Sequence, residues 1–144
     1  MYEVLCANYT LGSYFLRFVM ASKYSHSVVV DGDVVTHSTF LGGGVHKITL
    51  ARFNQHYPIQ SEPKDMGIRD VDAARAWLQD QVGKPYDWTA LASIALQWFV
   101  KRSWHELNHW FCSELIESIR SRFGTPRFSV DAAWITPKHQ DMVL

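Results

Sequence analysis

The chain has 144 residues, enough for one domain with its own core, and 47% of them are hydrophobic. Its 14 basic and 14 acidic residues balance, so it lacks the positive charge with which proteins bind a phosphate backbone, and we expect no nucleic-acid partner. No stretch approaches the ~20 apolar residues of a transmembrane segment, and the N-terminus does not resemble a secretory signal. We therefore expect a cytoplasmic or virion-associated protein.

Strand signals gather in the first part of the chain and helix signals in the second. Apolar alternation and β-branched runs predict strands at 2–7, within 26–38, at 45–50 and at 56–62, the last limited to a sheet edge by Pro58. Gly42-Gly43-Gly44 is expected to be a flexible loop. Helical periodicity predicts helices at 11–21, 70–82, 88–102 and 111–123. This order predicts a single α+β domain over residues 1–144, with a small antiparallel sheet packed against helices.

The hairpin at 26–38 carries a histidine on each arm. Asp31-Gly32 between two valine-rich runs is a strong signal for a two-residue turn. With these two residues as the loop, His26 lies opposite His37, and directly opposed side chains are ~5 Å apart at Cβ. The sequence therefore predicts two imidazoles side by side.

Cys112 is predicted in the first turn of the helix at 111–123. The positive end of a helix lowers the pKa of a thiol and offers free N–H groups to an oxyanion. A thiol at such a place, a histidine base and a group that orients the base are the parts of nucleophilic thiol catalysis. Each part also has a structural explanation, because cysteine is often buried and histidines pair on sheets. A non-catalytic structural or binding module, for example of a phage particle, is the alternative from another class.

A second motif points to zinc chemistry. His105-Glu106-Leu107-Asn108-His109 matches H-E-x-x-H, in which two histidines one helical turn apart bind zinc and the glutamate acts as base. The extended form with a further glycine and histidine is missing, and the segment is predicted to be the loop before the Cys112 helix. A zinc hydrolase is therefore the less favoured alternative.

Two segments resemble a known family. The stretches 82–88 (VGKPYDW) and 111–115 (FCSEL) resemble the Gly-x-Pro-Tyr … Cys-Ser-x-Leu pattern of NlpC-type, papain-like cell-wall peptidases. Because the histidines precede the cysteine, the chain is similar to the circularly permuted branch, which includes YiiX-like proteins and relatives of lecithin retinol acyltransferase. The resemblance spans most of residues 24–137.

The resemblance implies a catalytic triad in a permuted NlpC-like core. Cys112 would be the nucleophile, His26 the general base and His37 the residue that orients His26, with Tyr86 near the thiol. Tyr86 and Cys112 are 26 positions apart, farther than in ordinary members, and Thr89-Ala90 stand where the family has Gly-Gly.

The expected function is that of a thiol peptidase or amidase without metal or organic cofactor. Its substrate would be a peptide, amide or acyl ester, with a cell-wall peptide as the first choice and acyl-lipid transfer as the alternative within the same mechanism.

Overall fold

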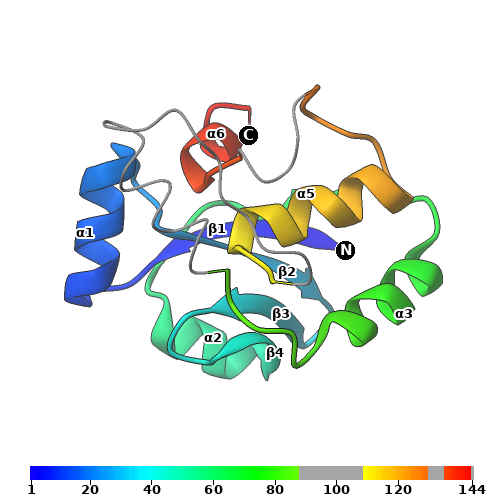
Figure 1. The fold of residues 1–144 in the computed structure, drawn as a ribbon, viewed down its shortest axis with the longest axis horizontal. Helices are drawn as coiled ribbons and strands as arrows, with labels where there is room; N and C mark the ends of the chain where they lie inside the picture. Colours follow the sequence, from blue (N-terminus) through cyan, green and yellow to red (C-terminus); the bar gives the residue numbers. More distant parts are fainter. Residues whose placement is uncertain (88–108, 130–134, 144) are drawn as a thin grey trace.

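The computed structural model describes residues 1–87, 109–129 and 135–143 and confirms the expected α+β architecture. An antiparallel sheet of six strands has the order β4-β3-β2-β1-β5, and β6 also pairs with β1 (Figure 1). The strands are β1 (Tyr2–Ala7), β2 (His26–Asp31), β3 (Val34–Thr39), β4 (Gly44–Thr49), β5 (Ile59–Gln60) and β6 (Lys64–Asp65). The helices are α1 (Leu11–Met20), α2 (Leu50–His56), α3 (Val71–Gln81), α5 (Cys112–Phe123) and α6 (Pro137–Asp141). No helix among these residues is long and apolar enough to cross a bilayer.

Side-chain alternation gives the sheet two buried faces. Val29 of β2 belongs to the core formed with α3 and α5, whose members include Leu78 and Ile116. Its neighbour Val28 belongs to a second core on the other face, where Phe53 of α2 is fully buried. Because successive strand residues point to opposite faces, each residue of β2 has its side fixed by the parity of its position.

The hairpin turn lies one residue later than the sequence predicts. Asp31 pairs with Val34, so the loop is Gly32-Asp33 and not Asp31-Gly32. Gly32 has a φ of 59°, and Asp33 is not among the non-glycine residues with positive φ. This is the pattern of a type II′ turn, which needs positive φ only at its first position, whereas the type I′ turn that Asp-Gly favours needs it at both. His26 is therefore not directly opposite His37, but the shift of two positions leaves both on one face.

Two further expectations are corrected or only partly met. Residues 50–56 form α2, which the sequence analysis did not predict, because seven residues are too few for a clear helical period. The Thr49 side chain accepts from Arg52 N–H, so one residue ends β4 and caps α2. The strand expected at 56–62 is reduced to Ile59–Gln60, at the edge of the sheet as predicted. The helix expected at 88–102 lies outside the described residues.

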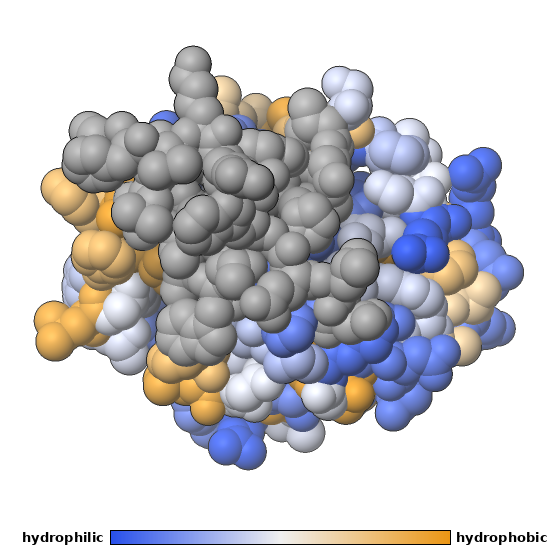
Figure 2. All heavy atoms as spheres, viewed as in Figure 1, coloured by the Kyte–Doolittle hydropathy of each residue, from blue (hydrophilic) through white to orange (hydrophobic). Residues whose placement is uncertain are grey.

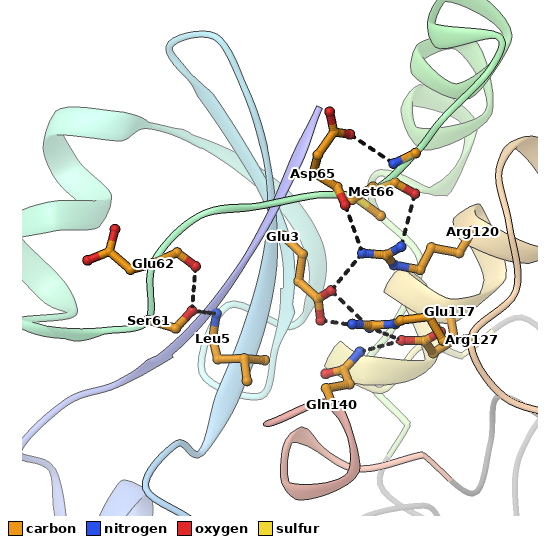
Figure 3. Close-up of polar contacts among 11 residues, drawn as sticks. Glu3, Leu5, Ser61, Glu62, Asp65, Met66, Glu117, Arg120, Arg127 and Gln140 are labelled. Atoms are coloured by element: carbon orange, nitrogen blue, oxygen red, sulfur yellow. Dashed lines mark hydrogen bonds and ion pairs between the residues drawn. The ribbon is translucent and has the colours of Figure 1, made fainter. Parts of the chain in front are cut away.

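A buried ionic network holds the C-terminal part of the chain to the sheet (Figure 3). Glu3 of β1 is fully buried and binds Arg120 of α5 at 3.1 Å and Arg127 at 2.9 Å. Arg127 also contacts Glu117, whose carboxylate accepts from Gln140 of α6 at 2.9 Å. Two carboxylates and two guanidinium groups thus neutralise one another inside the protein, as buried charges require.

Candidate thiol site

The site begins where two neighbouring strands separate. Pairing between β2 and β3 extends only to Val29 and Thr36. Beyond that point the segment leading into α5 contacts both strands. The Ser38 hydroxyl of β3 donates to the Trp110 carbonyl at 2.6 Å, and Ser27 of β2 lies close enough to the Cys112 sulfur to lower the pKa of its thiol. The tip of α5 therefore lies in the fork between the two strands.

Cys112 is the first residue of α5 and only 2% exposed. Burial raises the pKa of its thiol to about 11, although hydrogen bonds from Ser27 and from the backbone N–H groups of Ser113 and Cys112 itself lower it. The helix N-terminus thus acts in the expected direction but is outweighed by desolvation. At neutral pH the resting group is a thiol, so it needs a base to become a nucleophile.

The two predicted imidazoles meet. His26 Nε2 lies 3.0 Å from His37 Nδ1, and both side chains are buried. Burial lowers the pKa of His26 to about 3 and that of His37 to about 2, with a smaller contribution from neighbouring imidazoles. Both rings are therefore neutral, and one donates a proton to the other in this hydrogen bond. In the tautomer in which His26 Nε2 donates to His37 Nδ1, His26 Nδ1 is the nitrogen able to accept a proton from a reacting group.

Tyr57 packs against the imidazole pair. Its ring stacks on His26 with centroids 5.5 Å apart. Burial raises the pKa of its hydroxyl, and the charges of Cys6 and Cys112 raise it further. Sequence reasoning missed Tyr57, because it follows a short helix with no motif of its own.

Ser27, beside the sulfur, directly follows His26 in β2, so Cys112 and the imidazole pair lie near the same end of this strand. Ser27 has the parity of Val29, on the face of α5, whereas His26 has the parity of Val28, on the face of α2. Among the described contacts none joins Cys112 directly to either imidazole.

Tyr86 lies in the cluster around the thiol, where the family resemblance places it. It is buried with Met20, Phe111 and Cys112, and its ring is 5.9 Å from that of Phe111. Burial raises the pKa of its hydroxyl, and the Cys112 charge adds to this. Cys6 is fully buried in the core beneath α2.

Backbone pairing with β4 fixes the segment before Tyr86. Val45 N–H donates to the Lys84 carbonyl at 2.9 Å, and Gly83 N–H donates to the Val45 carbonyl at 2.8 Å. A Cβ on Gly44 would lie 2.0 Å from the Lys84 oxygen, so only glycine permits this approach. Gly44 is thus the first residue of a strand and not, as expected, part of a flexible loop.

A third imidazole stands beside the pair. His46 of β4 is directly opposite His37 of β3, and their ring centroids are 4.2 Å apart. His46 Nδ1 donates to the Gly44 carbonyl at 3.0 Å, which fixes the orientation of the ring. The alternation of the predicted strand 45–50 could have identified this neighbour, had the register of the sheet been known.

The zinc motif lies mostly outside the described part of the chain. Only His109 of the five residues is described, and it has an interaction partner. Among the described residues no group of three or more His, Cys, Asp or Glu is arranged to hold a metal ion.

Comparison with known proteins adds no assignment. No protein-family model matches the chain, and no curated protein matches its sequence. The resemblance to permuted NlpC-type proteins therefore stays a prediction.

Proposed function

We propose that the protein is a thiol hydrolase in which Cys112, His26 and His37 act as a catalytic triad on an amide or ester bond. The observation that supports the proposal is the buried hydrogen bond between His26 and His37, near the end of β2 where Ser27 lies beside the thiol that begins α5. A base whose second nitrogen is held by another side chain has a fixed tautomer and orientation, which is the role of the third member in such triads.

The reaction follows from the nitrogen atoms that are left free. His26 Nδ1 takes the proton of the Cys112 thiol as the sulfur attacks the carbonyl carbon, and the proton on His26 Nε2 is shared with His37 Nδ1. The leaving amine or alcohol then takes the proton from His26, and a thioester remains on Cys112. Water, deprotonated by His26, attacks the thioester and releases the acid and the free thiol. N–H groups at the start of α5 can stabilise the oxyanion, each contributing on the order of 3 kcal/mol.

Because the site is buried, a negative charge on the Cys112 sulfur or a positive charge on the His26 ring is costly when it forms alone. The thiol has its pKa raised to about 11 and His26 has its pKa lowered to about 3, so a lone thiolate or a lone imidazolium is disfavoured. Proton transfer between them creates both charges together, and their attraction offsets part of the desolvation of each. The substrate class that fits best is a peptide or amide, including a cell-wall peptide, with acyl-ester or acyl-lipid transfer as the variant of the same chemistry.

A non-catalytic binding module is the second candidate. The observation that favours it is the Cys112 side chain itself, which is only 2% exposed and has a raised pKa. A buried cysteine of this kind can serve packing alone.

The pH dependence of Cys112 alkylation separates the two candidates. In the triad, iodoacetamide should modify Cys112 at pH 7 at least about tenfold faster than in a His26→Ala variant, because His26 supplies the base. Without that base the rate should rise about tenfold per pH unit toward pH 11, following a thiol with the raised pKa. Mass spectrometry assigns the modified residue, and the experiment is done in a Cys6→Ser background. Identical pH profiles in the two proteins would favour the binding module.

Hydrolysis of an activated ester and of a peptide amide tests the catalytic roles. Cys112→Ser should abolish turnover while leaving the circular dichroism spectrum and melting curve unchanged. His37→Gln should lower turnover less than His26→Ala, because another polar side chain can partly orient the base. Equal and complete loss in both histidine variants would contradict the assigned roles.

A further inference from the structure

Helix α1 exposes an apolar face. Leu11 is 88% exposed, Phe15 59% and Phe18 85%, and their spacing places them on one side of the helix. Tyr9 and Tyr14 are also exposed beside them. Figure 2 shows hydrophobic spheres gathered over α1, at the left of the view. Large exposed apolar patches on a protein mark interaction sites.

The opposite face of α1 is packed. Leu16, Val19 and Met20 lie against the cluster that contains Tyr86 and Cys112. The buried Ser13 hydroxyl bonds to that of Ser25 at 2.7 Å. The helix is therefore fixed in orientation, and its apolar side points outward as part of a well-packed element.

The charged residues of the sequence interval that contains this face have one sign, although the Asp141 carboxylate of α6 lies near Tyr24. No acidic residue occurs between Glu3 and Asp31, and the charged residues in that interval are Arg17 and Lys23. The Arg17 guanidinium lies 5.5 Å from the centre of the Tyr14 ring, at the border of the apolar face, and Lys23 is exposed. A surface of aromatic and aliphatic side chains bordered by cations complements the interface of a bilayer that contains anionic lipids.

The size of the face argues against a stable protein partner. A helix of ten residues is ~15 Å long, so its outer side offers on the order of a few hundred Å², below the ~800 Å² that each partner contributes to a standard interface. A lipid surface has no such minimum, because a few inserted side chains and adjacent cations suffice for reversible binding.

We propose that the exposed face of α1 docks on an anionic lipid bilayer. Leu11, Phe15 and Phe18 enter the boundary between headgroups and acyl chains, while Arg17 and Lys23 lie among the headgroup phosphates. The proposal does not depend on the chemistry of Cys112. It brings the thiol cluster close to the bilayer, because the same helix packs against that cluster.

Co-sedimentation with vesicles tests the proposal on the full chain. The probe is vesicles of phosphatidylcholine alone or mixed with phosphatidylglycerol. The wild type should sediment with the mixed vesicles, and a Leu11→Ser/Phe15→Ser/Phe18→Ser variant should bind at least about tenfold less. The matched control replaces three exposed apolar residues outside α1, as Val34→Ser/Met142→Ser/Val143→Ser, and should bind like the wild type. Lys23→Gln should weaken binding to the mixed vesicles only.

Three outcomes would overturn the proposal: no sedimentation of the wild type, undiminished binding of the α1 variant, or equal loss in the control. Light scattering without lipid tests whether the face instead binds a second copy of the chain. If the wild type is a dimer and the α1 variant is a monomer, the face serves self-association and the lipid proposal is overturned. Melting curves establish that each variant is folded. If the triple variant does not fold, Phe18→Ser alone serves as the second variant and should lower binding several-fold.

Discussion

Replacing Gly44 by alanine tests how closely β4 must approach the segment that carries Tyr86. The new Cβ would lie 2.0 Å from the Lys84 carbonyl oxygen and 2.8 Å from Pro85 Cα. Both are backbone atoms, so no side-chain rotation relieves the overlap. The strand and the segment must move apart.

The cost can be worked from the contacts that separation breaks. The hydrogen bonds from Val45 N–H to Lys84 and from Gly83 N–H to Val45 are lost, at about 1 kcal/mol each. The φ of 132° at Gly44 adds about 1 to 3 kcal/mol of strain for a residue with a side chain. The sum is about 3 to 5 kcal/mol, which for a domain of this size lowers the Tm by about 10 °C or more.

Thermal unfolding followed by circular dichroism measures this loss, and Gly43 supplies the control. Gly43 also has a positive φ, 76°, but a Cβ there would meet no atom within 4 Å. Gly43→Ala should therefore show the strain alone, and the difference between the two variants is the effect of the collision. If Gly44→Ala melts no lower than Gly43→Ala, the close approach is not required and the reasoning is refuted.

Three other perturbations have defined outcomes. Glu3→Gln leaves the buried Arg120 and the partly buried Arg127 short of a negative charge, and it should cost about 3 to 5 kcal/mol in urea unfolding. Arg75→Gln, which breaks an exposed ion pair, should leave the midpoint nearly unchanged. Because the pKa values of His26 and His37 are lowered to about 3 and 2 in the folded state, the unfolded chain binds more protons below pH 6.5. Stability is thus complete above that pH and should fall with acidification by about 1.4 kcal/mol per pH unit for each histidine. Urea unfolding at pH 7.5 and pH 5 should show this loss in the wild type and much less of it in a His26→Gln/His37→Gln variant, while equal pH dependence in both would contradict the assignment. On the proposed mechanism, His46→Ala should lower turnover several-fold with little change in KM, because the ring packed on His37 is removed, and unchanged turnover would show that His37 needs no such support.

The histidine pair shows what a sequence can and cannot predict. The sequence predicts the turn one residue too early, yet His26 and His37 still meet. Moving the loop by one residue moves the residue opposite each strand position by two places. Because side chains alternate between the two faces of a strand, a shift of two places leaves each side chain on the same face as its new neighbour. The sequence therefore predicts the face of the sheet on which a side chain lies more securely than the residue that lies opposite it.

Other features depend on contacts that the local sequence does not encode. Nothing around Tyr57 indicates that its ring stacks on His26, since the contact requires α2 to fold back over the sheet. The glycine at position 44 resembles a loop residue until Lys84 is placed beside it. The sequence predicts the start of the helix at Cys112 to within one residue. It does not predict that the pKa of the Cys112 thiol is raised. A helix N-terminus by itself lowers the pKa of a thiol, and the burial that raises it depends on the tertiary structure.

A continuous run of backbone hydrogen bonds joins the two halves of the site. Val45 binds Lys84, and Trp110 N–H then donates to the Pro85 carbonyl at 3.0 Å. The segment from 83 to 87 thus connects β4, which carries His46, to the residues just before Cys112. Backbone hydrogen bonds therefore set the position of the thiol relative to the imidazoles. Unlike contacts between long side chains, these bonds cannot be changed by rotating a side chain. Such a connection explains why a glycine far from Cys112 in the sequence has no room for even one additional carbon atom.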